Sequence, residues 1–265
     1  MSGGSRGIGL AIALRAARDG ANVVLLAKTA QPNERLRGTV FSAAEEIEAA
    51  GGHALPVVGD VRSDESIAEA VAAALDRFGG IDICVNNASA LSDQKTLDVS
   101  PKSYDLMQDI NARGTFMLTR ACLPALLESN SPHVLTLSPP IILDSDWLAR
   151  FPAYMMSKFG MTLATLAIAA EFDDRGMSAN CLWPRTTIAT DAVRNLLGGD
   201  EAVNRARLPE IVADAAYAIL TDSPRRLNGQ TLVDDEVLRA SGVTDFASYA
   251  VSGVDADLDS DFFLN

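Results

Sequence analysis

Short runs of β-branched and apolar residues alternate with longer amphipathic segments along most of this 265-residue chain. A parallel sheet requires such alternation, because each strand must reach the next through a crossover helix. The pattern predicts strands at residues 23–27, 54–60, 83–86, 134–137, 178–183 and 230–233, and helices at 7–19, 39–50, 64–78, 101–128, 153–174 and 208–221. We therefore expect an α/β fold, a Rossmann-like doubly wound parallel sheet with helices on both faces.

The length suits one large α/β domain. We assign residues 1–235 to this domain and residues 236–265 to an acidic C-terminal extension of it. Within the extension, four aspartates between residues 255 and 261 alternate with small or apolar residues before Phe262 and Phe263. Such a segment is expected to be mobile or lightly docked. The alternative is that its two aromatic side chains dock on a neighbouring subunit.

The formal net charge of −13 argues against nucleic acid or an anionic membrane surface as a partner, because both need a positive field. The three cysteines have no metal or redox spacing, so we expect no metal site and a reduced, cytoplasmic location. No apolar run approaches the ~20 residues of a spanning helix, and the first residues have no signal-peptide pattern. We expect no membrane span.

The chain opens on a glycine-rich stretch that directly precedes the first predicted helix. Gly3 permits a tight turn, Gly7 lets backbone amides approach a phosphate, and Gly9 lets the helix pack closely against the sheet. The helix N-terminus would then face the pyrophosphate of a dinucleotide. Glycine clusters also precede ordinary helices, so this interpretation depends on the motifs that follow. The predicted cofactor loop comprises Gly3, Ser5, Arg6, Gly7, Ile8 and Gly9.

A strand normally precedes a glycine loop of this kind, and here only Met1 and Ser2 stand before Gly3. A central buried strand supplies ~5 apolar residues. Its absence would open a gap between neighbouring strands and leave backbone groups unpaired. We therefore expect an apparently truncated first strand. A start site assigned too late would explain it, and the alternative is a genuinely shortened form that folds poorly and binds cofactor weakly.

The end of the strand at residues 23–27 bears on the choice of cofactor. An NAD-binding sheet carries a carboxylate there for the ribose 2′-hydroxyl, whereas this chain has Ala27, Lys28 and Thr29. Lys28 and Arg6 would instead complement a 2′-phosphate. This predicts NADP(H) as the preferred cofactor, with NAD(H) as the alternative. The competing interpretation is that both cations are solvated surface charges.

Tyr154 and Lys158 stand four residues apart in the predicted helix 153–174, which places both side chains on one face. A phenol with a reference pKa near ~10 needs help to ionise at neutral pH, and a neighbouring ammonium supplies it. The pair predicts Tyr154 as general acid in carbonyl reduction and general base in alcohol oxidation. The same spacing recurs by chance on ordinary helices, so this interpretation also rests on the cofactor motifs.

Taken in order, these motifs resemble those of the short-chain dehydrogenase/reductase family. The resemblance covers residues 2–235, and within the family it is strongest to the branch that contains the hydroxysteroid dehydrogenase-like proteins and bacterial citronellol dehydrogenases. It rests on the glycine loop, Asp60-Val61, Asn86-Asn87-Ala88-Ser89, Asn111, Tyr154 with Lys158, and Pro184 through Thr190.

The resemblance implies roles for individual residues. The implied cofactor contacts are Asp60 and Val61 at the adenine, Asn87 and Ala88 at its ribose, Ile188 and Thr190 at the nicotinamide carboxamide and phosphate, and Lys158 at the nicotinamide ribose. Asn111 would interrupt its helix and position a water that links Lys158 to solvent. The resemblance also implies a homodimer or homotetramer that packs through residues 107–128 and 153–174.

One departure from the family pattern concerns substrate orientation. The position of the family's substrate-orienting serine is occupied here by Pro139, and Ser138 stands one residue earlier. Neighbouring side chains of an extended segment point to opposite faces, so Ser138 serves as a catalytic candidate only if a bulge rotates it back. Ser145 is the alternative donor. Arg185, where many relatives have glycine, is either a substrate anion contact or a solvated loop residue.

The loops around Trp147, Phe151 and Leu196 are rich in apolar residues, which predicts an apolar pocket with a lid hinged near Gly198 and Gly199. We expect an oxidoreductase acting on a hydrophobic alcohol, aldehyde or ketone. The alternative is a non-catalytic cofactor-binding regulatory or scaffold protein on the same fold, which Pro139 and the missing strand would favour.

Overall fold

The computed structural model describes residues 1–32, 36, 38–223 and 226–264. Its strands are β1 Asn22–Ala27, β2 His53–Val58, β3 Ile83–Asn86, β4 His133–Leu137, β5 Ser178–Trp183 and β6 Thr231–Val233. All pairings between these strands are parallel, in the order β1-β2 and β3-β4-β5-β6. The α/β prediction is confirmed, and each predicted strand is present within two residues of its expected ends.

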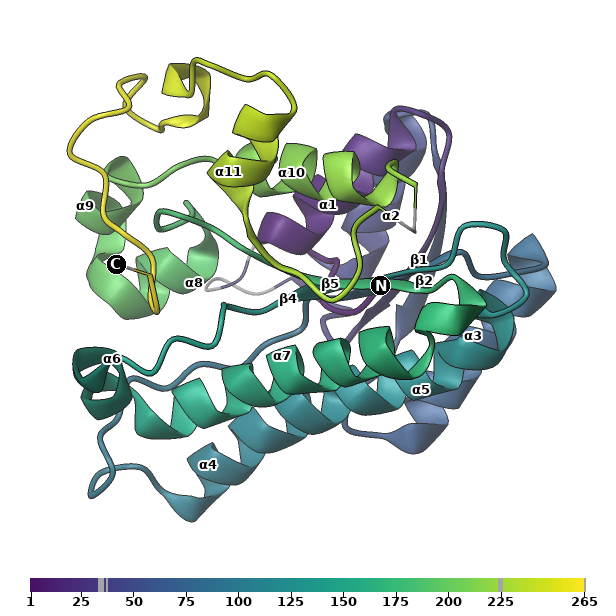
Figure 1. The fold of residues 1–265 in the computed structure, drawn as a ribbon, viewed down its shortest axis with the longest axis horizontal. Coiled ribbons are helices and arrows are strands. Elements are labelled where there is room, and N and C mark those ends of the chain that lie inside the picture. Colours follow the sequence, from purple (N-terminus) through teal and green to yellow (C-terminus); the bar gives the residue numbers. More distant parts are fainter. Residues whose placement is uncertain (33–35, 37, 224–225, 265) are drawn as a thin grey trace.

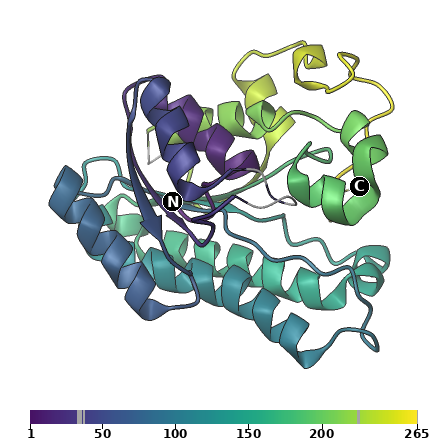
Figure 2. The ribbon, with the colours of Figure 1, turned by 180° about the vertical axis from the view of Figure 1, so that it is seen from behind.

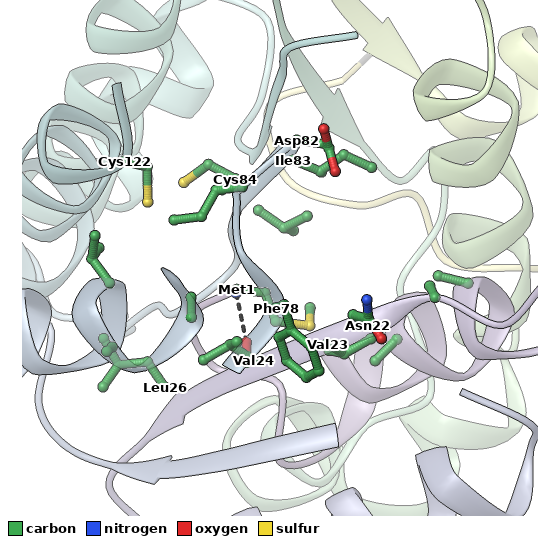
Figure 3. Close-up of a pocket in the computed structure, with 18 of the residues that line it drawn as sticks. Met1, Asn22, Val23, Val24, Leu26, Phe78, Asp82, Ile83, Cys84 and Cys122 are labelled. Carbon is green, nitrogen blue, oxygen red and sulfur yellow. Dashed lines mark hydrogen bonds between the residues drawn. The ribbon is translucent and has the colours of Figure 1, made fainter. Parts of the chain in front are cut away.

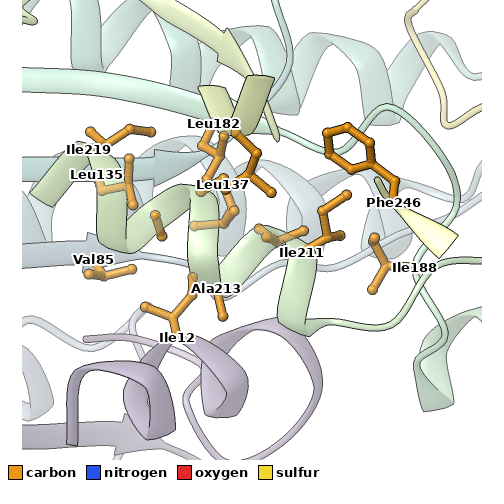
Figure 4. Close-up of a cluster of buried hydrophobic side chains, with 14 residues drawn as sticks. Ile12, Val85, Leu135, Leu137, Leu182, Ile188, Ile211, Ala213, Ile219 and Phe246 are labelled. Carbon is orange, nitrogen blue, oxygen red and sulfur yellow. The ribbon is translucent and has the colours of Figure 1, made fainter. Parts of the chain in front are cut away.

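The helices cover both faces of the sheet (Figures 1 and 2). On one face lie α1 Gly7–Ala17, α2 Val40–Ala49, α10 Glu210–Leu220 and α11 Asp234–Ala240; on the other lie α3 Asp64–Phe78, α4 Pro101–Met107, α5 Gly114–Leu126 and α7 Pro152–Glu171. Figure 4 shows the core of the first face, where Ile12 of α1 and Ile211 and Ile219 of α10 share one buried cluster with Leu135 and Leu182 of the sheet. Burial of such side chains is the main favourable term in folding.

Further short elements carry the chain between these layers or over one end of the sheet. They are the π-helical turns Gln108–Arg113 and Arg194–Gly198, the helices α6 Ser145–Arg150, α8 Asp191–Val193 and α9 Gly199–Asn204, and the 3₁₀ turns Asp173–Arg175 and Ala247–Tyr249. The first π turn divides the predicted helix 101–128 into α4 and α5. The other predicted helices are present with ends shifted by three residues or fewer.

The sheet is interrupted between β1 and β3, where the truncated first strand was predicted. Ser2 alone bridges the two edges, through isolated parallel bridges to Leu26 and Asn86. Beyond Ser2 the edges enclose a cavity of about 340 Å³. Figure 3 shows Val23 and Val24 of β1 on one side of it and Ile83 and Cys84 of β3 on the other, with the Met1 ammonium group donating to the Val24 carbonyl at 2.8 Å. The predicted gap is therefore present.

The segment after α11, for which we expected a mobile or lightly docked chain, packs against the domain. Residues 255–264, here called the docked segment, run back over the carboxyl ends of the strands (Figure 1). Phe263 is fully buried and Leu264 is nearly so. The aromatic side chains dock within the same chain, where they find an apolar cluster that includes Tyr154.

Within the part of the chain that the structure describes, α7 alone is long and apolar enough to cross a membrane by length and composition. Most of it is buried inside the domain, where its buried face includes both Tyr154 and Lys158. This burial is typical of the core helix of a globular domain.

Candidate active site

The glycine loop leads into α1 at the carboxyl ends of the strands. The α1 N-cap, Arg6, makes no side-chain capping hydrogen bond, so the first amides of the helix remain available to an anion. A Cβ on Gly9 would lie 2.5 Å from the Gly3 carbonyl oxygen and from Asn87 Nδ2, so the turn closes only with glycine there. Beside the loop lies a cavity of about 320 Å³ lined in part by Ser5, Gly7 and Thr190. This cradle fits a dinucleotide pyrophosphate.

Hydrogen bonds tie the glycine loop to the loop after β3. Ser2 Oγ accepts from the amides of Asn87 at 3.2 Å and Ala88 at 3.1 Å. Asn87 Nδ2 donates in return to the Gly3 carbonyl at 2.8 Å. Two predicted cofactor segments, far apart in sequence, are thus held side by side.

The predicted adenosine end carries an ion-pair cluster after β1 and β2. Lys28 Nζ lies 3.2 Å from Asp60 Oδ2, and Arg62 Nη2 lies 2.6 Å from the same oxygen. The hydrogen bond from Arg62 is the largest cause that lowers the pKa of Asp60 to about 2. Val61 is buried. On the opposite side, Arg6 Nη2 donates to the Gly38 carbonyl at 2.6 Å.

Tyr154 and Lys158 lie on one face of α7 and are both almost fully buried. Lys158 Nζ donates to the Leu137 carbonyl at 2.8 Å and lies 5.1 Å from the centre of the Trp183 ring and 6.0 Å from that of Tyr154. Burial lowers the pKa of Lys158 to about 7, against the opposing effect of Asp261. Burial raises the pKa of Tyr154, Asp261 raises it further, and a hydrogen bond with Ser89 lowers it.

Asn111 lies in the π turn between α4 and α5 and is fully buried. Its side chain accepts from the Ala90 amide at 2.7 Å and donates to the Ala90 carbonyl at 2.9 Å and to Ser157 Oγ at 2.8 Å. Asn111 thereby joins the loop after β3 to α7 one residue before Lys158. The structure thus places Asn111 in direct contact with Ser157, the residue before Lys158.

Two nicotinamide-side residues lie in the loop after β5. Ile188 is buried and forms a parallel bridge with Arg207. Thr190 caps α8, because its Oγ1 accepts from the Val193 amide at 3.3 Å, and it faces Gly7 across the cavity beside the glycine loop. Thr190 therefore borders the glycine loop, whereas Ile188 belongs to the buried core.

The structure does not bring Ser138 to the tyrosine as a donor. Its hydroxyl is fully buried and accepts from Thr162 Oγ1 at 3.0 Å, and it also contacts the Cys181 thiol. Ser138 therefore belongs to the polar interior between the sheet and α7. Arg185 pairs with Asp235 at 3.2 Å and with Glu236, so its charge is already matched within the chain.

Sequence reasoning assigned no role to several residues that surround the tyrosine. Ser89, in the exposed part of the loop after β3, contacts its hydroxyl. Phe262 and Phe263 pack on its ring, with ring centres 6.5 and 5.9 Å away. The signal that could have found the last two is the pair of aromatic residues closing an otherwise acidic segment.

The buried carboxyl group of Asp261 is expected to make the stability of the folded domain depend on pH. Enclosure by protein raises the pKa of Asp261 to about 7, from an ordinary value of 3.8. Its protonated form is therefore favoured in the folded state, and stability is lost as the pH rises through about 7. We expect Asp261→Asn to raise the melting temperature at pH 8 and to bring little change near pH 4. Thermal unfolding across this range, with the exposed Asp257→Asn as control, measures the difference. An offset that is the same at every pH would contradict the assignment.

The sequence matches both a known family model and a group of similar proteins. A family model described as Enoyl-(Acyl carrier protein) reductase matches residues 3–236. Hydroxysteroid dehydrogenase-like protein 2 of Danio rerio is 49% identical over 266 residues, which cover 100% of this chain and 63% of that protein. This chain thus spans less than two thirds of that relative's length.

Two solved structures are also similar. A protein from Xanthomonas campestris described as a dehydrogenase is 52% identical, with a TM-score of 0.95 over 100% of this chain and 96% of that chain. A metagenomic short-chain oxidoreductase in complex with NADP is 26% identical, with a TM-score of 0.70 over 88% of this chain and 93% of that chain.

Proposed function

Because this chain belongs to the short-chain dehydrogenase/reductase family, we propose that it is an NADP-dependent oxidoreductase acting on a hydrophobic alcohol, aldehyde or ketone. The observation that carries the proposal is the buried Tyr154 and Lys158 pair on α7, in a domain whose glycine loop can cradle a dinucleotide. The family supports a nicotinamide cofactor and an oxidoreductase activity. The cofactor preference, the residue roles and the substrate class are our proposals.

The preference for NADP is supported by charge at the adenosine end. Lys28 is more than half exposed beside the carboxyl end of β1, and Arg6 lies at the start of α1. A 2′-phosphate between them would gain two charge-assisted contacts. Asp60 and Val61 would meet the adenine, Asn87 and Ala88 its ribose, and Ile188 and Thr190 the nicotinamide side.

The chemistry at Tyr154 follows from its surroundings. NADPH, when bound, supplies the hydride. Tyr154 donates its phenolic proton to the substrate oxygen in reduction and takes it back in oxidation. The Lys158 ammonium stabilises the resulting phenolate, and Asn111 positions α7 and the loop after β3 around both. The closely packed apolar side chains around Tyr154 exclude water, which strengthens this charge interaction.

We propose that Ser89 supplies the hydroxyl that orients the substrate, since Pro139 occupies the position of the family's substrate-orienting serine and has no hydroxyl group. It contacts the Tyr154 hydroxyl from the exposed loop after β3, whereas Ser138 is turned into the interior. We expect Ser89→Ala to lower kcat by about tenfold and to move the pH profile of turnover upward, because the hydrogen bond from Ser89 lowers the pKa of Tyr154. Ser89→Thr should restore both values.

The control for this prediction is Ser92→Ala, a serine of the same loop whose hydroxyl donates to Gln94 at 3.2 Å. Steady-state kinetics from pH 6 to 10 on all three variants provide the measurement. An unchanged pH profile for Ser89→Ala would show that Ser89 does not act on the tyrosine.

The assembly and location that we propose follow the family. Phe116 on α5, and Met156 and Leu163 on α7, expose large apolar side chains on the face expected to join subunits. We propose a homodimer or homotetramer, cytoplasmic, in which residues 1–235 form the domain and residues 236–265 its acidic extension. Light scattering on the purified protein measures the subunit number.

The proposed activity is tested by following NADPH oxidation with a panel of apolar aldehydes and ketones, and NADP reduction with the matching alcohols. Turnover of at least one apolar substrate is expected. Cofactor binding without turnover over the whole panel would favour the regulatory or scaffold alternative. That alternative is favoured by Pro139, which occupies the position of the family's substrate-orienting serine. The intact Tyr154 and Lys158 pair weighs against it.

A further inference from the structure

We propose that the docked segment, residues 255–264, forms the substrate-side wall of the active site and selects substrates by the size of their apolar part. This inference rests on the proposed function, since it names a specificity element of the same site. It assigns a role to a segment that the sequence alone presents as an acidic extension.

The segment is anchored close to the candidate active site. The Thr187 amide donates to the Asp259 carbonyl at 2.9 Å, and the Asp261 amide donates to the Arg185 carbonyl at 3.1 Å. Trp183 Nε1 donates to the Phe262 carbonyl at 2.8 Å. These hydrogen bonds attach the segment to β5 and the loop that follows it, so its side chains are held at fixed positions.

Ion pairs hold the preceding part of the segment. Arg207, which is only 4% exposed, lies 2.6 Å from Asp255, and Arg205 lies 3.0 Å from Asp259. Removing the carboxylate partner of a buried arginine leaves an unpaired buried charge, which lowers the stability of the folded state. The aspartates that alternate along the segment therefore have a structural use, as partners for the two arginines after α9.

The two phenylalanines of the docked segment pack against the ring of Tyr154. Phe263 is fully buried, with its ring centre 5.8 Å from those of Trp147 and Phe159 and 6.2 Å from that of Trp183. Phe262 is partly exposed and its ring centre lies 4.8 Å from that of Phe151. The segment thus covers part of the ring of Tyr154.

An apolar group attached to the reacting carbon would extend toward Phe262, because Phe262 lies between the tyrosine and the α6 side chains. Shortening this side chain should enlarge the space for the substrate, whereas Phe263 supports the core and is left intact. In a hydrophobic pocket, one methylene group changes kcat/KM by roughly 10- to 200-fold. Phe262→Ala should therefore favour longer substrates.

The test compares the wild-type chain, Phe262→Ala and the control Phe41→Ala. The control removes an exposed phenylalanine from α2, which lies on the face of the sheet opposite α7. With NADPH, the ratio of kcat/KM for 2-decanone over 2-butanone should rise by about tenfold or more in Phe262→Ala and stay constant in the control. A ratio equal to that of the wild type would overturn the proposal.

A second readout does not depend on turnover. The chain contains two tryptophans, and both Trp147 and Trp183 contact the docked segment. Titration with 2-decanone should change tryptophan emission saturably, and Phe262→Ala should shift the midpoint to lower concentration by about tenfold. If the wild-type chain turns over neither these two ketones nor any other member of the carbonyl and alcohol panel, the proposed function fails. The midpoints of the emission titrations then test the proposed role of the docked segment without turnover. Equal midpoints for the wild-type chain and Phe262→Ala would overturn that role.

Discussion

Tyr154→Phe should abolish measurable carbonyl reduction while leaving NADPH binding unchanged. The phenol lies near Lys158 and Ser89 and against the apolar cluster, and its loss removes the proton that the substrate oxygen must receive. Positioned general acid catalysis contributes about 10²- to 10⁴-fold, so kcat should fall by that factor. Because Phe keeps the ring packing against Phe263, we expect little change in the melting temperature.

The matched control is Tyr104→Phe, which makes the same chemical change on α4 in a side chain that packs on the same cluster. It should retain wild-type turnover. Steady-state kinetics, together with an NADPH titration of each variant, separate chemistry from binding. Equal loss of activity in the two variants would point to disturbed packing and would count against Tyr154 as the proton donor.

The second large effect concerns the cavity between β1 and β3. Five apolar, β-branched residues placed ahead of Met1 should enter it as a parallel strand, because the cavity lies between the facing edges of β1 and β3 and is lined by apolar side chains of both. Filling a cavity of about 340 Å³ should raise the free energy of unfolding by about 2–4 kcal/mol. In a chain of this size the melting temperature should rise by roughly 5–10 °C.

A glycine-serine extension of the same length provides the control, since it adds chain without apolar side chains to bury. Differential scanning calorimetry compares both extended forms with the chain that begins at Met1. If the two extensions shift the melting temperature equally, the apolar residues do not occupy the cavity and the interpretation of this gap is wrong.

Much of the fold was accessible from the sequence because its signals are local. The alternation of apolar runs predicted every strand, and the two residues ahead of Gly3 predicted the gap in the sheet. The spacing of Tyr154 and Lys158 is fixed by one helix, so their common face followed without knowledge of the tertiary structure. The glycine loop and the loop after β3 were likewise identified from short motifs.

The remaining features depend on contacts between distant parts of the chain. Phe263 meets Tyr154 across more than a hundred residues, and no local pattern in an acidic segment predicts that contact. The direction of Ser138 was left open by its sequence, since a bulge would have reversed it, and the structure turns it toward Thr162. The proximity of Ser89 to Tyr154, on which its proposed role as donor rests, depends on the path of the loop after β3 and has no local signal in the sequence.

The central claim is that this chain is an NADPH-binding oxidoreductase, and its most direct test is a fluorescence titration of the protein with NADPH and NADH in parallel. We expect saturable binding of both NADPH and NADH. NADPH should bind at least about tenfold more tightly, because its 2′-phosphate would gain Lys28 and Arg6 as charged partners. Tighter binding of NADH would overturn the assignment of these two cations. Binding of neither dinucleotide would contradict the account of the glycine loop and, with it, the proposed function.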